Sequence, residues 1–500
     1  MERSVGSGRK KKRTASAGHE SSLAMMYCTD ADEWNGLGAM TSKKICCGFT
    51  MGLVFEFLCG GTAFAQAVVK FPDRIVDIRQ FGAKMVAAKF LYDTAPIQQA
   101  IDACAAAGGG TVVIPKGNWL TGPLFLRSNV RLELQRGAEL AATTEEALFL
   151  KTPATAVWAA NSYVAMINIA DAENVAVVGE GRIDGQGAVW WEKWRATTRT
   201  TGVRPGANRP RLVFVARSRN ILFQGVSFYN SPSYHLVFKD CEKVTVDHIK
   251  ITALAHSPNT DAIDPIDTRD MEITNNVIDC GDDVVAIKSA HVDPKHPGAS
   301  SGNITIANNT VLKGRGISIG SETVGGVKHV LVENNTTYDA MYGIRIKTPR
   351  KRGGEVSDIV YRNNRMVNVE TPIVFSTYYE TLPVDEAEVR RRLAGGGFVL
   401  NDQIYPDDRD PAQPYAEHQT PDVHDVTVDG LTATGADRVG IIIGLPERPI
   451  RGLTLKNVEV QATETLRVRH AEVHAEGIKL QVTKSPAVTL ESGEKTNGLK

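Results

Sequence analysis

The sequence is poor in cysteine. Seven cysteines occur in 500 residues, and only Cys104, Cys241 and Cys280 lie beyond the first 65. Cleavage before Gln66, which the N-terminal sequence predicts below, would leave only these three cysteines. Three cysteines allow at most one disulfide, which excludes a small disulfide-stapled fold. Cysteine pairs at metal-binding spacing are also absent, so no structural zinc site of the cysteine type is predicted.

The sequence has no excess of charge of either sign. Lysine and arginine together number 57, and aspartate and glutamate also number 57. This balance gives no reason to expect a nucleic acid or another polyanion as a partner. Long helical patterns are missing as well, whereas glycine is abundant at 45 residues, which favours many turns. The hydrophobic content of 42% suits a globular protein with a large core.

An apolar stretch lies near the N-terminus, at residues 40–65. The segment has two lysines near its start, Lys43 and Lys44, continues with mostly apolar residues and ends with an Ala-x-Ala sequence, which is the pattern of a secretory signal cleaved before Gln66. Residues 1–39 would then be an extension absent from the mature protein, and residues 66–500 would form one domain. We expect a secreted or periplasmic protein without stable membrane association. Glu56 interrupts the apolar stretch, and an uncleaved membrane anchor is the competing interpretation.

A short strand–turn–strand pattern recurs along the chain. Examples are "NILFQGVSF" at Asn220, "DMEITNNVI" at Asp270 and "HVLVENNTT" at His329. Neighbouring copies lie roughly 23 to 33 residues apart, a period typical of repeat folds whose units bury their faces against each other. No long helix separates the strands, which favours a parallel β-helix over βαβ units and over a β-sandwich. Asparagines at similar places in several repeats predict a hydrogen-bonded ladder.

One helix is predicted close to the start of the repeats. The segment "DTAPIQQAIDACAAAGGG" has an N-cap at Asp93 or Thr94, Pro96 in its first turn and Gly108 as its stop. We expect this helix to cap the open end of the β-helix, because terminal repeats need a cover. Residues 380–420 break the period and predict a long loop on the binding side.

Carboxylates gather at one point of the repeat. Asp282 and Asp283 precede an apolar run, and Asp261 lies about one repeat earlier. Residues one repeat apart stack in a β-helix, so the three would share a surface, where like charges raise the pKa of at least one of them. A protonated acid beside an ionised one is what glycoside hydrolysis requires. Taken alone, the pair Asp282 and Asp283 could equally mark the end of a strand or a cation-binding site in place of a catalytic pair.

Two cations share a face of a later strand. Arg345 and Lys347 are two residues apart, so their side chains point the same way. A rigid pair of cations suits a substrate that bears carboxylates, since arginine binds a carboxylate through two hydrogen bonds. A solvated strand face is the alternative.

In this combination the residues resemble the motifs of glycoside hydrolase family 28, the polygalacturonase family. The motifs are "NTD" (Asn259–Asp261), "GDD" (Gly281–Asp283), "GISIGSET" (Gly316–Thr323) and "RIK" (Arg345–Lys347), and the likeness runs from about Val76 to Val460. The resemblance implies an all-β fold, a right-handed parallel β-helix in a single domain with the short capping helix. It also implies a monomer that hydrolyses α-1,4-galacturonosyl linkages of pectin with inversion, without cofactor or metal.

The resemblance assigns the catalytic residues. Asp282 is expected to be the general acid, while Asp261 and Asp283 hold and activate the water, and Asn259 orients the acids. Inversion generally places acid and base roughly 6.5–9.5 Å apart.

The substrate-binding residues are expected around the acids. Arg345 and Lys347 would bind galacturonate carboxylates, and Tyr378 or Tyr379, one repeat later, would stack on a sugar ring unless it packs at the rim. His235, in the motif "NSPSYH", is a further candidate, although a lone histidine on an apolar strand is more often structural.

The chain departs from the family at Arg315, where members carry a histidine that contacts the acids. A permanent cation there favours ionised carboxylates and predicts a weaker acid at Asp282. Three consequences stay open: an impaired enzyme, a shifted pH optimum or a preference for a decorated pectin such as rhamnogalacturonan, and direct binding of a substrate carboxylate by Arg315. The alternative function is therefore a catalytically weak or altered-specificity pectin-binding β-helix. The order of the motifs argues against a third class, a metal-dependent lyase.

Overall fold

The computed structural model describes residues 69–85, 92–201, 208–254, 256–379 and 411–499. The predicted extension at 1–39, the predicted signal at 40–65 and most of the predicted loop at 380–420 lie outside these residues. Within the described ranges, no helix has the length and apolar character needed to span a bilayer.

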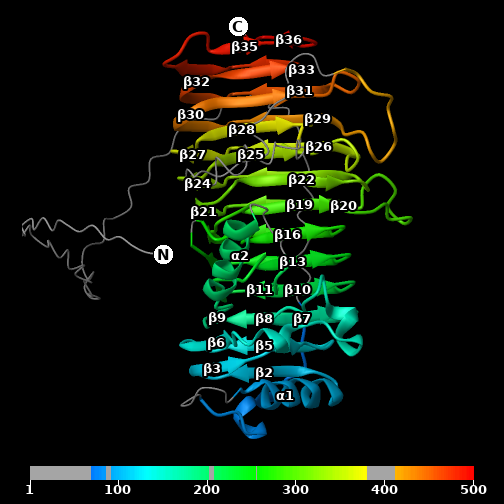
Figure 1. The fold of residues 1–500 in the computed structure, drawn as a ribbon, viewed down its shortest axis with the longest axis vertical. Coiled ribbons are helices and arrows are strands. Elements are labelled where there is room, and N and C mark those ends of the chain that lie inside the picture. Colours follow the sequence, from blue (N-terminus) through cyan, green and yellow to red (C-terminus); the bar gives the residue numbers. More distant parts are fainter. Residues whose placement is uncertain (1–68, 86–91, 202–207, 255, 380–410, 500) are drawn as a thin grey trace, which may run out of the picture. The chain divides into compact units, whose positions relative to one another are not determined.

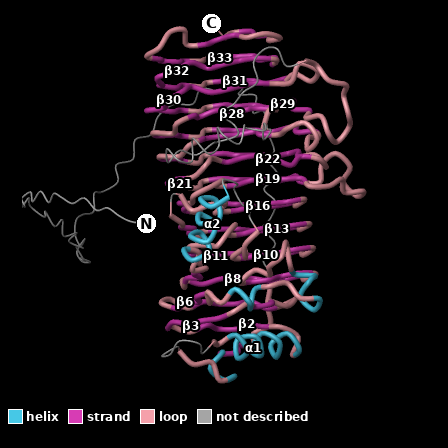
Figure 2. The backbone as a smooth tube through the Cα atoms, viewed as in Figure 1, coloured by secondary structure: helices cyan, strands magenta, loops and turns pink. Residues whose placement is uncertain are grey.

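The described chain winds into a right-handed parallel β-helix, as predicted (Figure 1). Its strands stack in three rows, and Figure 2 shows loops joining one row to the next. The first row is a 14-stranded sheet: β1 (Ile75–Asp77), β2 (Gly110–Ile114), β5 (Val130–Leu134), β8 (Glu173–Gly179), β11 (Arg219–Gln224), β14 (Glu242–Asp247), β17 (Arg269–Thr274), β20 (Ser301–Ala307), β23 (Val327–Glu333), β26 (Glu355–Arg362), β29 (Asp422–Asp429), β31 (Ile450–Lys456), β33 (Ala471–Glu476) and β36 (Lys495–Asn497).

The other two rows belong to a 22-stranded sheet. One of them, called the site row below, contains β4 (Leu124–Phe125), β7 (Ile167–Ala170), β10 (Val213–Ala216), β13 (Leu236–Lys239), β16 (Ile263–Ile266), β19 (Val285–Ser289), β22 (Ile317–Thr323), β25 (Tyr342–Lys347), β28 (Thr371–Ser376) and β35 (Val488–Leu490). The other contains β3 (Gly117–Thr121), β6 (Ala138–Ala142), β9 (Arg182–Asp184), β12 (Ser227–Tyr229), β15 (Lys250–Thr252), β18 (Val277–Asp279), β21 (Thr310–Lys313), β24 (Thr336–Tyr338), β27 (Arg365–Val367) and β34 (Lys479–Val482). The long strands β30 (Thr432–Ile443) and β32 (Glu459–Arg469) pair with both rows.

The predicted period is confirmed at the level of strand register. Ile221 of β11 pairs with Val244 of β14, and Ile304 of β20 pairs with Val330 of β23. These side chains are buried in one continuous hydrophobic core. Each turn of the coil therefore adds a layer to the core of its neighbours, as expected for a repeat fold.

The predicted asparagine ladder follows the first row. Asn276, Asn309, Asn335 and Asn364 are buried, and the side-chain amide of each of the first three donates to Oδ1 of the next at 2.9, 2.9 and 3.1 Å. The four amides also donate to main-chain carbonyls. The ladder thus satisfies polar groups inside the coil and links four successive turns.

Asn309→Leu is expected to lower the urea midpoint of unfolding. Oδ1 of Asn309 accepts from both the main-chain N–H and the side-chain amide of Asn276. Each buried donor left unpaired costs about 1–3 kcal/mol. The control Lys313→Ala, at an exposed position of β21, is expected to stay within about 0.5 kcal/mol of wild type. Equal midpoints for the two variants would mean that the ladder does not stabilise the fold.

The helix predicted at the N-terminal end is α1 (Thr94–Ala106), and it covers the first strands of the coil (Figure 1). Its buried face joins the hydrophobic core, so the predicted cap is confirmed. Asp93 occupies the N-cap position without a capping bond from its side chain. Its Oδ1 accepts instead from the main-chain N–H of Lys84.

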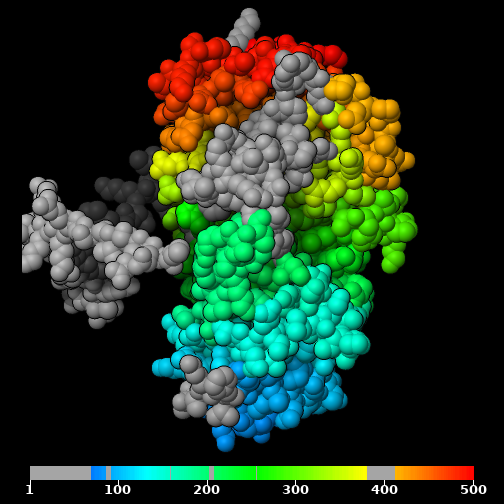
Figure 3. Space-filling view, in the orientation of Figure 1, coloured from blue at the N-terminus to red at the C-terminus, as the bar shows by residue number. Residues whose placement is uncertain are grey.

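A second helix, α2 (Ala188–Thr201), was not predicted. The indole of Trp191 is buried and donates to the carbonyl of Ser231 at 3.1 Å. A Cβ added at Gly187 would lie 2.6 Å from the carbonyl oxygen of Asn230, so only glycine allows this approach. In the space-filling view the residues of α2 stand out on the face shown (Figure 3). The helix therefore fixes the loop that leads into β13.

Candidate active site

The candidate site lies on the outward face of the site row. Alternate residues of each strand enter the core, and those between them point outward. The outward positions carry Asp264 on β16, Lys288 on β19, Ser318 on β22, and Arg345 and Lys347 on β25. Ser318 pairs with Arg345 across neighbouring strands, so these side chains are held one turn apart.

The three predicted acids meet where the chain enters β16 and β19. Asp261, Asp282 and Asp283 each have a carboxylate oxygen within 4.8 Å of the others, and their exposed fractions are 5%, 9% and 3%. A Cβ at Gly281 would lie 2.6 Å from the carbonyl oxygen of Ser257. The glycine of the "GDD" motif is therefore required for the close packing that brings the acids together.

Asp261 is the acid most disposed to keep a proton. Burial, together with the charge of Asp282, raises the pKa of Asp261 well above its usual range. Its Oδ1 has no hydrogen-bond partner, and its Oδ2 lies 4.0 Å from Nζ of Lys288. Lys288 makes its shorter ion pair, at 2.7 Å, with the fully buried Asp264.

Asp283 is the ionised member of the cluster. Burial opposes its ionisation, but the ammonium of Lys347 and the guanidinium of Arg345 outweigh burial and hold the pKa of Asp283 below its usual range. Lys347 donates to Oδ2, while Oδ1 accepts from Ser318 at 3.0 Å and from Arg345 at 3.4 Å. Arg345 and Lys347 share a face, as predicted, and the carboxylate that they contact in this structure is that of Asp283.

Arg315 reaches the acids. Its Nη1 lies 3.2 Å from both carboxylate oxygens of Asp282, and its main-chain N–H donates to the Asp282 carbonyl at 2.8 Å. Burial disfavours the guanidinium charge, yet the carboxylates of Asp282 and Asp283 raise the pKa of Arg315. The spacing of the three acids could accommodate a metal ion, but Arg315 and Lys347 already place positive charge on two of them.

Asn259 and His235 flank Asp261. Asn259 has a left-handed backbone, with φ of 52°, and its Oδ1 accepts from Arg209 at 3.2 Å. His235 is fully buried, and burial lowers its pKa to about 4, so the ring is neutral. Nε2 accepts from the main-chain N–H of Ser231, which leaves Nδ1 to donate to the carbonyl of Asp261 at 3.2 Å. His235 thus lies beneath the acids and supports the main chain at Asp261.

The two tyrosines after β28 differ in position. Tyr378 is 6% exposed and packs against apolar side chains of β30. The ring of Tyr379 lies over the two cations, with its centroid 5.4 Å from Cζ of Arg345 and 5.0 Å from Nζ of Lys347. Tyr378 therefore packs against the protein, which was the alternative to stacking on a sugar ring. Tyr379 is the tyrosine whose ring lies beside the two cations.

Sequence reasoning missed four residues of this surface. Lys288 and Asp264 form the buried ion pair described above, and both Lys288 and Arg211 lie 5.3 Å from the ring centroid of Tyr234. Asp264 and Lys288 could have been found from the strand period, because each is a charged residue at an outward-facing position of an otherwise apolar strand. Arg211 and Tyr234 carried no comparable signal, since neither lies within a regular strand.

Comparisons with known proteins agree with this geometry. The family model described as glycosyl hydrolases family 28 matches residues 104–388. The endo-polygalacturonase of Pectobacterium carotovorum subsp. carotovorum is 34% identical over 302 residues, which cover 57% of this chain and 72% of that protein. The polygalacturonase of Ralstonia nicotianae is 31% identical over 342 residues, or 58% of this chain and 62% of that protein.

Solved structures share the fold. The polygalacturonase of Erwinia carotovora ssp. carotovora superposes with a TM-score of 0.63 at 27% identity, over 81% of this chain and 97% of that one. The family 28 exopolygalacturonase of Yersinia enterocolitica gives a TM-score of 0.66 at 18% identity, over 85% of this chain and 78% of that one, and supports the fold alone. The matched residues include the three clustered acids and the cationic pair, and the chain belongs to glycoside hydrolase family 28.

Proposed function

We propose that this glycoside hydrolase is a polygalacturonase that cleaves α-1,4-galacturonosyl linkages of polygalacturonate and pectin. The observation that carries the proposal is the buried acid cluster, in which Asp261 has a raised pKa and Asp283 a lowered one. Two carboxyl groups of opposite protonation state are what acid and base catalysis of glycoside hydrolysis needs. Relatives named polygalacturonase and endo-polygalacturonase favour this function over a binding protein without turnover.

In the proposed reaction Asp282 protonates the leaving oxygen, while Asp261 and Asp283 hold the attacking water and the ionised Asp283 takes its proton. Two carboxylate oxygens less than 4.8 Å apart can both hydrogen-bond to one water, since each such bond spans about 2.7–2.8 Å. This spacing is shorter than the roughly 6.5–9.5 Å expected for inversion. The product anomer, read by proton NMR during early turnover, tests inversion directly.

Arg315 has to leave Asp282 before Asp282 can act as an acid. A galacturonate carboxylate is a competing partner for the guanidinium, because arginine binds carboxylates in a bidentate manner. We propose that the substrate draws Arg315 away from Asp282 and so makes Asp282 available for protonation. Arg345 and Lys347 would bind a second carboxylate, with Tyr379 against the sugar ring and Asn259 holding the acids in place.

The test is reducing-end release from polygalacturonate and from rhamnogalacturonan across pH, with wild type and Arg315→His side by side. Wild type is expected to cleave polygalacturonate. Arg315→His removes the guanidinium that is paired with Asp282, so the rate on polygalacturonate should rise. Arg219→His, at an exposed arginine paired with Glu173, is the control and should leave the profile unchanged. Wild type that binds both polymers but cleaves neither would contradict the proposed function, and an ultraviolet-absorbing unsaturated product would instead indicate a lyase.

We further propose that the protein is a secreted monomer acting on plant cell-wall pectin. The Met40–Ala65 segment has the sequence of a secretory signal. N-terminal sequencing of the exported protein should begin at Gln66, and size-exclusion chromatography with light scattering should give one chain.

A further inference from the structure

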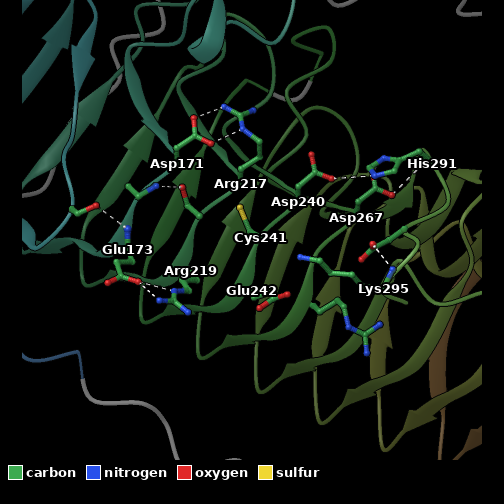
Figure 4. Close-up of a pocket in the computed structure, with 15 residues that line it drawn as sticks. Asp171, Glu173, Arg217, Arg219, Asp240, Cys241, Glu242, Asp267, His291 and Lys295 are labelled. Atoms are coloured by element: carbon green, nitrogen blue, oxygen red, sulfur yellow. Dashed lines mark hydrogen bonds and ion pairs between the residues drawn. The ribbon is translucent and has the colours of Figure 1, made fainter. Parts of the chain in front are cut away.

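A column of charged residues runs along the side of the coil, at the turns that follow the site row. Asp171, Arg217, Asp240 and Asp267 come directly after β7, β10, β13 and β16, all with left-handed backbones at φ of 53°, 48°, 55° and 49°. The main-chain N–H of each of these four residues donates to a main-chain carbonyl in the next coil of the β-helix, for example from Asp240 to Ile266 at 3.0 Å. Consecutive members therefore stack one above another, as Figure 4 shows.

The column is balanced at one end and acidic at the other. Arg217 binds both carboxylate oxygens of Asp171, at 2.7 and 2.8 Å (Figure 4). The next two turns both carry aspartates, Asp240 and Asp267, which repel each other. His291, from the loop after β19, lies between them: its Nε2 is 3.5 Å from Oδ1 of Asp240 and its Nδ1 is 3.0 Å from Oδ2 of Asp267.

The carboxylate of Asp267 is buried, and one of its two oxygens has no hydrogen-bond partner. Its side chain is 2% exposed, and Oδ1 accepts from the N–H of Ala290 at 2.9 Å and from the hydroxyl of Ser289 at 3.2 Å. Oδ2 is buried and makes no hydrogen bond, although the His291 ring is close by. A buried carboxylate oxygen without a hydrogen-bond partner, beside an imidazole nitrogen 3.0 Å away, is an available donor for a cation.

We propose that Asp240, Asp267 and His291 bind one divalent transition-metal ion, independently of the polygalacturonase activity. Each offers one donor atom, and these atoms all lie within 4.8 Å of one another. Donors to Zn²⁺ sit about 2.0–2.2 Å from the ion, so two donors of one site lie at most about 4.4 Å apart, and small side-chain shifts would bring these three atoms within that limit. One imidazole and two carboxylates suit Zn²⁺ better than Ca²⁺, which prefers oxygen donors throughout.

The surroundings allow an ion to enter and give it a structural task. The three groups line a surface hollow of about 740 Å³, where water can complete the coordination. Arg217, Arg269 and Lys295 also line it, but Arg217 is bound to Asp171 and the guanidinium of Arg269 bonds to the carbonyl of Ala299. A bound ion would tie the loop after β19 to the turns of the two preceding repeats.

The test is a calorimetric titration of the full chain with Zn²⁺ after treatment with EDTA. Wild type is expected to bind one Zn²⁺ at this site and to melt at a higher temperature when it is loaded. Asp267→Asn and His291→Gln should each weaken binding at least about tenfold. His296→Gln is the matched control, because His296 lies in the same loop but pairs with Asp293.

The variants also separate the possible failures. His291 is half exposed, so His291→Gln should fold even if the buried Asp267→Asn does not, and circular dichroism checks both. Hydrolytic activity is expected to be unchanged in the three variants. No Zn²⁺ binding to wild type, or binding that both His291→Gln and Asp267→Asn retain, would overturn the proposal. Weaker binding only in His296→Gln would overturn it as well.

Discussion

Asp282→Asn is expected to lower kcat on polygalacturonate by about 10²–10⁴-fold, the usual contribution of a general acid, with little change in KM. The amide has the shape of the acid but no acidic proton to give to the leaving oxygen. The measurement is the initial rate of reducing-end release over the full pH profile, with circular dichroism to confirm the fold. Asp171→Asn, at a surface ion pair beside Arg217, is the matched control and should retain wild-type rates.

A second carboxyl variant makes this test decisive. Asp261 has the raised pKa of the cluster, while Asp282 is bonded to Arg315. If Asp282→Asn kept near-wild-type rates and Asp261→Asn lost them together with the alkaline limb of the profile, the acid would be Asp261. The assignment that rests on family resemblance would then be wrong, although the hydrolase function would stand.

Lys347→Met has the largest expected effect on stability. Removal of one partner from a buried ion pair costs up to about 3–5 kcal/mol, and Asp283 would keep only Arg345, at 3.4 Å, as a cationic partner. Lys347 is 7% exposed and Asp283 4% exposed by side chain, so water cannot replace the lost ammonium. Urea unfolding at neutral pH should show the full loss, and Lys347→Arg should restore most of the stability because it keeps the charge.

The pH dependence of that loss follows from the pKa of Asp283. In wild type this pKa is held below the unfolded value, so the ionised Asp283 stabilises the fold above the unfolded pKa of about 3.9. That stability disappears as pH falls through the folded pKa. Lys347→Met raises the folded pKa, so its destabilisation should be largest at neutral pH and shrink in acid. An equal loss of stability at all pH values would mean that Lys347 acts by packing, not by charge.

The sequence predicted the fold and the meeting of the acids because both depend on one period. Apolar residues spaced by the repeat specify which residues pair, and Ile221 and Val244 pair as the pattern required. Asp261 and Asp282 are close for the same reason. Residue spacing is enough to predict these features, although the close approach of the acids also needs Gly281.

Features set by packing were not predictable in this way. The helix α2 depends on the contact between Trp191 and the Ser231 carbonyl, which no local pattern encodes. Tyr378 and Tyr379 follow the end of β28, where strand alternation stops, and only the structure decides which ring is buried. That Arg345 contacts Asp283 depends on the stacking of three turns, whereas sequence reasoning gave Arg345 only a substrate carboxylate as partner.

The ion pairs of the candidate active site have a consequence for the binding of an anionic polymer. The site's four carboxylates are matched by four contacting cations: Asp261 and Asp264 by Lys288, Asp282 by Arg315, and Asp283 by Arg345 and Lys347. An anionic polymer that binds here would compete with these carboxylates for the cations, so its affinity would be the difference between two sets of ion pairs. Uptake of a proton by Asp261 leaves one positive charge in excess. Under the proposed function, acidification is therefore expected to favour binding of the polyanion, and neutralisation its release.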